Sequence, residues 1–126
     1  MSAPASRLAI LLWAASPEKP DLAAAPFVYA TAAAAFDAEV ELHFAGPACE
    51  LLVQGVAEQA VTAGGKAVYA FMREAAALDV RFLACAMAIA RHKEAGRALI
   101  PELAGEAGAS AFVQRALDPE WRTLVF

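Results

Sequence analysis

The sequence alternates between short apolar runs typical of buried strands and longer segments with helical spacing. The first apolar run, Arg7–Trp13, is unbroken after Arg7, as expected of a strand buried on both faces. Strands that alternate with helices pair in parallel, because the chain returns across the sheet through each helix. The sequence therefore predicts an α/β fold, a three-layer α/β/α sandwich around a mostly parallel sheet of four or five strands.

The boundaries of the elements follow from hydrophobic spacing and from glycine and proline. The predicted strands are Arg7–Trp13, Ala38–Phe44, Val80–Ala84 and Arg122–Phe126, with room for a short further strand within Ile100–Gly108. The predicted helices are Pro20–Phe36, Cys49–Gln54, Ala67–Leu78, Cys85–Ala95 and Ser110–Leu117. Residues 56–65 fit neither pattern, except that Gly64-Gly65 predicts a turn.

Size and composition limit the class of protein. The 126 residues suit one domain, 1–126, with a single core. With 60% hydrophobic and only 19% charged residues, a monomer of this size would expose apolar surface, which favours a homo-oligomer. The formal net charge of −4, without a cluster of basic residues, argues against nucleic acid as a partner.

The N-terminal run allows two interpretations. Leu8–Ala15 after Arg7 resembles the apolar region of a signal peptide, which would imply a secreted protein. We favour the strand, because the downstream alternation needs it. No apolar run reaches the ~18–20 residues that cross a bilayer, so no membrane partner is expected. The spacing of Cys49 and Cys85 matches no zinc motif, so we expect free thiols, no metal and a cytoplasmic protein.

Cys85 is the candidate catalytic residue. It falls where a predicted strand ends and a helix begins, and binding sites of parallel sheets lie at that edge. The positive end of a helix stabilises a thiolate, the form required of a nucleophile or sulfur carrier. The alternative is that Cys85 only packs as a small apolar residue, which is common for cysteine. From position alone, the two interpretations weigh about equally.

Other polar residues are weaker candidates. Cys49 is a possible second thiol, although simple packing explains it better. His92 lies about 10 Å along the helix from Cys85, too far for a direct hydrogen bond, and is expected at the surface. His43 alternates with Glu39 and Glu41 on one strand face; these three could hold a metal, but a solvated face explains the pattern better.

The whole layout resembles the DsrE/DsrF-like family, which includes TusD-like sulfur-relay proteins and YchN-like proteins. The resemblance rests on the segments RLAILLW, FDAEVELHF, GPACELLVQG, FMREAAALDVRFLACAMAIARH and WRTLVF. Its most specific point is the strand followed at once by Cys85, an Ala-rich helical turn and Arg91-His92. The resemblance implies a persulfide-carrying role for Cys85, a three-layer fold, and trimers or hexamers.

Two functions follow as hypotheses. In the first, Cys85 takes up sulfane sulfur as a persulfide and passes it between donor and acceptor proteins, without metal or organic cofactor, as a sulfur carrier or sulfurtransferase. In the second, the protein is a non-catalytic oligomeric module that binds a ligand or another protein at the same edge of the sheet. Four residues are candidates for binding a substrate or ligand there: Trp13, Phe44 and Met87 as apolar wall and Ser16 as a polar contact.

Overall fold

A computed structural model of the protein describes residues 6–126, so the first five residues of the predicted domain lie outside the described part. Residues 6–126 form five strands and six helices. The strands are β1 (Arg7–Leu12), β2 (Glu39–Phe44), β3 (Arg81–Ala84), β4 (Leu103–Glu106) and β5 (Trp121–Val125). The helices are α1 (Pro20–Ala35), the 3₁₀ helix η1 (Gly46–Leu52), α2 (Val56–Gln59), α3 (Val68–Ala77), α4 (Ala86–Glu94) and α5 (Ala109–Leu117).

All five strands are parallel and lie in the order β4-β3-β2-β1-β5. Strand β1 pairs with β2 on one side and β5 on the other, so the first apolar run is an interior strand, as predicted. The short strand predicted within Ile100–Gly108 is β4, at one edge of the sheet. The predicted α/β sandwich with a parallel sheet is confirmed, with five strands.

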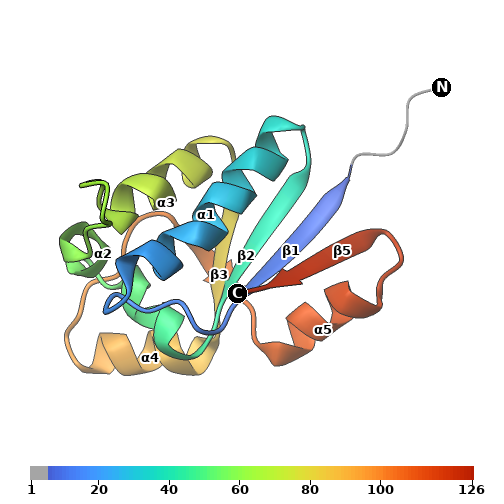
Figure 1. Cartoon of the computed structure of the whole chain (residues 1–126). Helices are drawn as coiled ribbons and strands as arrows, with labels where there is room; N and C mark the ends of the chain where they lie inside the picture. Colours follow the sequence, from blue (N-terminus) through green and yellow to red (C-terminus); the bar gives the residue numbers. More distant parts are fainter. Residues whose placement is uncertain (1–5) are drawn as a thin grey trace.

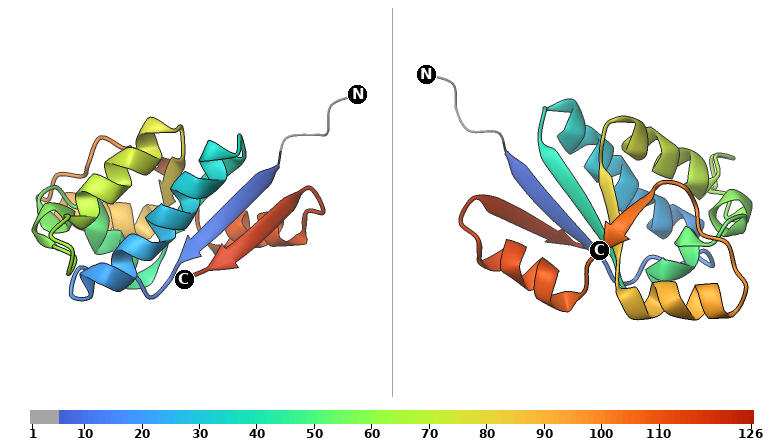
Figure 2. Two further views of the ribbon diagram at one scale, coloured as in Figure 1. Left: turned by 45° about the horizontal axis from the view of Figure 1, so that its top comes forward. Right: turned by 180° about the vertical axis from the view of Figure 1, so that it is seen from behind.

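Helices cover both faces of the sheet. Helices α1 and α3 pack together on one face, in front of the sheet in Figure 1. The last strand, β5, joins the edge opposite β4, so the β4–β5 connection carries α5 back across the other face. The view from behind in Figure 2 shows α5 in front of the sheet and α4 along its carboxyl end. By placing α5 over β2, this crossover buries the polar side chains of Glu41 and His43.

Three aromatic rings form the centre of the core beneath α1. Phe27 on α1 lies 5.9 Å from the ring of Phe44 on β2 and 5.8 Å from that of Phe82 on β3. The rings of Phe44 and Phe82 are 5.4 Å apart, and all three side chains are fully buried. Tilted aromatic contacts of this kind add to the hydrophobic burial and fix α1 against β2 and β3.

Local sequence explains where several helices begin and end. Pro20 opens α1 at a position where its missing N–H costs nothing. Gly96, with φ of 74°, follows the end of α4, as predicted from its left-handed preference. The helix predicted at Cys49–Gln54 is instead the 3₁₀ helix η1, which begins earlier because Pro47 fits its first turn.

The ambiguous stretch 56–65 contains the one-turn helix α2 and a tight turn. Gly65, with φ of 87°, donates its N–H to the Thr62 carbonyl at 2.9 Å within that turn. The turn predicted at Gly64-Gly65 is therefore confirmed. None of the helices formed by residues 6–126 is long and apolar enough to span a membrane.

Candidate functional site at the carboxyl edge of the sheet

Three neighbouring strands end level with one another. Leu12, the last residue of β1, pairs with Phe44, and Phe44 pairs with Ala84 at the end of β3. The residues that follow, Trp13, Ala45 and Cys85, therefore come together at one edge of the sheet. This is the edge at which the sequence predicted a site.

Cys85 caps the N-terminus of α4, as predicted. Its Sγ accepts a hydrogen bond from the Ala88 N–H at 3.4 Å, and its backbone is extended, with φ of −68° and ψ of 142°. The positive end of α4 and the Ala88 N–H both favour a negatively charged sulfur. The side chain is partly exposed. Whether Cys85 reacts stays a prediction.

A cavity of about 190 Å³ opens beside Cys85, between the strand ends and the start of α5. Its wall is mainly apolar, and the polar groups on its lining side chains are the thiol of Cys85, the imidazole of His43 and the indole N–H of Trp13. The remaining lining residues are Leu11, Phe44, Ala45, Ala107, Gly108, Ala109, Phe112 and Val113. The cavity can therefore take a small apolar group next to the thiol.

The structure brings together two of the four residues predicted to bind substrate. Trp13 and Phe44 both line the cavity with Cys85. Ser16 instead accepts a hydrogen bond on Oγ from the Glu18 N–H at 3.2 Å, within the turn that leads to α1. Met87 is 79% exposed on α4 and is not part of the cavity wall. Substrate binding by any of the four stays a prediction.

Trp13 is fixed at the cavity mouth by its backbone. Its N–H donates to the carbonyl of Phe126, just beyond β5, at 2.7 Å. Gly46 lies against it with φ of 54°, and a Cβ at Gly46 would be 3.4 Å from the Trp13 carbonyl oxygen. The indole remains 61% exposed, which leaves it free to contact a ligand or a partner.

A buried polar network lies beneath α5 and reaches the cavity through His43. Sequence reasoning missed this network. Arg115 donates from Nε and Nη2 to the two carboxylate oxygens of Glu41, at 3.0 and 2.9 Å. His43 Nε2 lies 3.0 Å from Glu41 Oε1. Burial raises the pKa of Glu41, but the hydrogen bonds from Arg115 and His43 outweigh it, so the pKa lies below its ordinary value.

The expectation that Glu41 and His43 lie on a solvated face is wrong. Glu41 is 1% and His43 3% exposed, because α5 covers this part of the sheet; Glu39 remains exposed. The His43 ring meets the edge of the Phe112 ring on α5, with centroids 5.4 Å apart. Arg115 occupies both oxygens of Glu41, so the alternative of a metal held by this triple does not fit the geometry.

Cys49 lies in a second, more polar hollow of about 260 Å³ between η1 and α4. Its thiol is buried and donates weakly to the Phe44 carbonyl at 3.5 Å. Burial, reinforced by the nearby Cys85, raises the pKa of Cys49 to about 11. Cys49 is therefore almost entirely protonated at neutral pH, and a protonated thiol is a poor nucleophile.

His92 lines the hollow of Cys49 and not the cavity of Cys85. Its side chain is only 9% exposed, so the expectation of a surface histidine is wrong. The residues of η1 that share this hollow cover that side of α4, which the sequence of α4 alone does not reveal.

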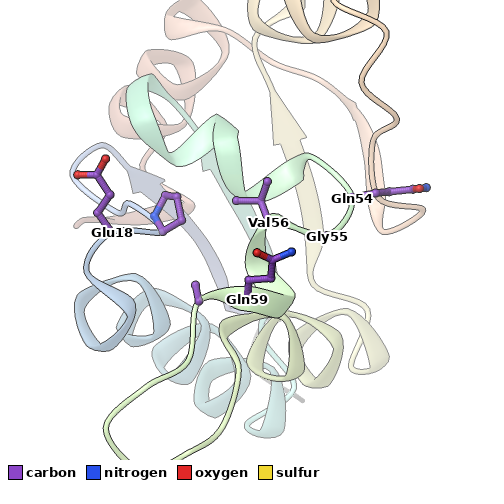
Figure 3. Close-up of a pocket in the computed structure, with 7 residues that line it drawn as sticks. Glu18, Gln54, Gly55, Val56 and Gln59 are labelled. Atoms are coloured by element: carbon purple, nitrogen blue, oxygen red, sulfur yellow. The ribbon is translucent and has the colours of Figure 1, made fainter.

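A larger hollow of about 380 Å³ lies near the start of α1, between the β1–α1 connection and α2. Figure 3 shows Glu18 and Gln54 on opposite sides of it, with Val56 and Gln59 between them. Its lining contains neither cysteine nor histidine, and Glu18 is its one ionisable side chain. We therefore place the candidate site in the smaller cavity, where a nucleophile is present.

A parallel five-stranded sheet with a cysteine at the helix terminus after β3 defines an α/β protein with one potential nucleophile at its carboxyl edge. The family model described as "DsrE/DsrF-like family" matches residues 9–126. The chain therefore belongs to the DsrE/DsrF-like family, as the sequence resemblance indicated. Members of this family are generally linked to sulfur relay.

Comparison with solved structures supports the fold. The crystal structure of the YchN protein from E. coli is similar, with a TM-score of 0.69 and 14% sequence identity. The match covers 97% of this chain and 99% of the YchN chain. A search of curated proteins found no match.

Proposed function

We propose that Cys85 carries sulfane sulfur as a persulfide. The observation that supports this most directly is the hydrogen bond from the Ala88 N–H to Cys85 Sγ, at the start of α4 and beside an open cavity. Gly108 and Ala109, at the start of α5, line the same cavity, so two helix N-termini favour negative charge there. A persulfide ionises more readily than a thiol and would benefit from both.

The proposed reaction consists of two thiol–disulfide-type exchanges. The Cys85 thiolate attacks the sulfane sulfur of a donor persulfide; the donor's S–S bond breaks, and the donor leaves as a thiolate. An acceptor thiolate then attacks the outer sulfur on Cys85, which leaves as a thiolate. No net oxidation occurs, and the reaction uses no metal or organic cofactor. The protein would thus act as a sulfur carrier or sulfurtransferase between a donor and an acceptor protein.

Cys49 is proposed to be a bystander in this exchange. Its raised pKa leaves little thiolate at neutral pH, and its side chain is 4% exposed. Both cysteines are free, which fits a reducing, cytoplasmic location.

Mass spectrometry of intact protein tests the proposal. The reduced protein is incubated with a persulfide donor and is expected to gain the mass of one sulfur atom. Cys49→Ser serves as the matched control and should gain sulfur like the wild type, whereas Cys85→Ser should not. Equal sulfur uptake by Cys85→Ser, or none by the wild type with any donor, would reject the proposal.

A second candidate function is binding of a partner without sulfur transfer. It is favoured by apolar side chains exposed near the cavity: Trp13 is 61%, Met87 79% and Val113 49% exposed. In this alternative Cys85 would remain unmodified by any donor, so the same mass experiment separates the two functions.

We also propose that the protein forms a homo-oligomer, a trimer or a hexamer. Large apolar side chains elsewhere on the surface support association: Phe36 is 87%, Leu117 79% and Val125 64% exposed. The three-fold symmetry comes from the family resemblance. Light scattering should give a mass of three or six chains; a stable monomer would contradict association, and a stable dimer would contradict its three-fold symmetry.

A further inference from the structure

His43 has a buried ring nitrogen without a hydrogen-bond partner. Its Nε2 contacts Glu41, but Nδ1 is the single buried side-chain nitrogen or oxygen among residues 6–126 that lacks a partner. Burying an unpaired polar atom costs on the order of 1–3 kcal/mol. His43 also lines the cavity of Cys85, and a small rotation of the ring would open Nδ1 to a molecule bound there, which would then supply the missing hydrogen bond.

The network under α5 determines what kind of group His43 can bind. Both oxygens of Glu41 accept hydrogen bonds from Arg115, and the Glu41 pKa is lowered, so the carboxylate is ionised and can only accept. His43 Nε2 must therefore carry the hydrogen that it shares with Glu41. In the neutral imidazole this leaves Nδ1 as a bare acceptor, which calls for a donor on the ligand.

The surroundings of His43 disfavour a charged ligand, whereas the helix N-termini favour negative charge on the sulfur of Cys85. The cavity wall holds no ionised side chain opposite His43, and a buried charge without a partner is strongly unfavourable. An anion at this position would meet the lone pair of Nδ1 and the nearby carboxylate of Glu41. A cation would lie near Arg115, which already neutralises Glu41. An uncharged donor avoids the repulsion that an anion would meet from Glu41 and the repulsion that a cation would meet from Arg115.

The size of the cavity sets the size of the ligand. Its volume of about 190 Å³ is close to that of cavities in other proteins that hold a single benzene-sized molecule, which are near ~150 Å³. The Phe112 ring, whose centroid lies 5.4 Å from that of His43, forms an aromatic wall beside the imidazole. A single ring or a short branched chain would fill the space.

We propose that the cavity beside Cys85 binds a small, uncharged, mainly apolar molecule with one hydrogen-bond donor, held by His43 Nδ1. The inference goes beyond the proposed sulfur-carrying function and stands without it. If both hold, a small thiol would be placed with its S–H toward His43, beside the persulfide of Cys85.

Two probes of nearly equal size test the binding site. Phenol carries a donor at neutral pH and fluorobenzene does not. Their affinities are measured on the reduced, sulfur-free protein by ¹H–¹⁵N NMR titration, so the outcome does not depend on sulfur loading. We expect both probes to shift the signals of the Trp13 indole and of the Phe112 and Val113 amides. If neither probe shifts them, the proposal is overturned.

Substitutions at His43 isolate the hydrogen bond. In His43→Gln the side-chain amide can still donate to Glu41, but no acceptor remains at the Nδ1 position. We expect the ratio of phenol to fluorobenzene affinity to fall roughly three- to tenfold, the value of one hydrogen bond. His43→Asn keeps an acceptor near Nδ1 and should retain most of the ratio. An unchanged ratio in His43→Gln would overturn the proposal.

Two further variants check the location. Val113→Trp should fill the cavity and abolish the binding of both probes, while His92→Gln, in the separate hollow of Cys49, should leave both affinities unchanged. Undiminished phenol binding to a folded Val113→Trp would show that the probe binds elsewhere, which also overturns the proposal. Thermal melting of each variant confirms that it is folded.

Discussion

Arg115 on α5 holds both carboxylate oxygens of Glu41 on β2, through two parallel hydrogen bonds of 3.0 and 2.9 Å. The Arg115 guanidinium also lies over the ring of Trp121 on β5, 4.1 Å from its centroid. One side chain thus links α5 to β2 in the middle of the sheet and to β5 at its edge. None of the side chains of α5 is fully buried, so this polar contact adds to the partly buried apolar contacts, such as that of Phe112, that hold α5 on the sheet.

Removing the arginine should destabilise the protein. Arg115→Met keeps much of the side-chain volume but leaves the buried Glu41 carboxylate with only His43 at 3.0 Å and the more distant Arg81 at 3.9 Å. Breaking a buried ion pair costs roughly 3–5 kcal/mol, and we expect about 2–4 kcal/mol here because the Arg115 side chain remains partly exposed. Urea unfolding measures the loss.

Two controls accompany this prediction. Arg81, whose side chain is 55% exposed, lies 3.9 Å from the same carboxylate, and Arg81→Met should cost less than about 1 kcal/mol. The double variant Glu41→Gln with Arg115→Met removes the buried charge and should recover part of the lost stability. Equal destabilisation by Arg81→Met and Arg115→Met would contradict the proposed role of Arg115.

Glu41 should make stability depend on pH in the acid range. Its pKa in the folded protein lies below the ordinary value of 4.5, so folding favours the ionised form. This contribution is fully present above pH 4.5 and is lost as the pH falls through the folded pKa. Urea unfolding between neutral pH and pH 3 should therefore show a smaller acid-induced loss in Glu41→Gln than in the wild type. Parallel pH profiles for the two proteins would exclude this contribution.

Local sequence was sufficient to predict the position of Cys85, because both signals are short-range. The apolar run Val80–Ala84 predicts a strand, and the helical spacing after it places Cys85 at the helix start. Since parallel strands end at one edge, the proximity of Trp13, Phe44 and Cys85 followed as well. All of these predictions required only neighbouring residues and the direction of the strands.

The surroundings of His43 could not be predicted in the same way. The alternation of Glu39, Glu41 and His43 indicates a polar strand face, but a solvated face and a face covered by a helix give the same pattern. The return of α5 across the sheet depends on the strand order, which no local pattern contains. One sequence feature could have indicated this contact. Arg115 is the only cation of the short helix α5, and a cation there can pair with a carboxylate on the strand that α5 covers, here Glu41 on β2.

The two cysteines should differ sharply in alkylation. At pH 8 the native protein is expected to react with iodoacetamide at Cys85, which is partly exposed, while Cys49 is protected by burial and a pKa of about 11. Peptide mass mapping after brief labelling locates the modification. In urea both thiols should react at similar rates, which serves as the control for intrinsic reactivity. Preferential labelling of Cys49 in the native protein would refute the assignment of Cys85 as the accessible thiol.

Gly46 should be intolerant of a side chain, and this tests the packing that fixes Trp13. Its φ of 54° is unfavourable for other residues, and a Cβ would be 3.4 Å from the Trp13 carbonyl oxygen. Gly46→Ala is expected to lower the free energy of unfolding, measured in urea, by about 1–2 kcal/mol, because a left-handed backbone is strained for alanine.

Gly64→Ala is the matched control for this prediction. Nothing lies within 4 Å of the added Cβ and φ is not positive, so the free energy of unfolding should change by no more than about 0.5 kcal/mol. Because a Cβ at Gly46 would lie 4.0 Å from the Trp13 ring, Gly46→Ala should also alter the NMR signal of the Trp13 indole, whereas Gly64→Ala should leave that signal unchanged. Similar effects of the two substitutions on stability and on the indole signal would show that Gly46 does not constrain the position of Trp13.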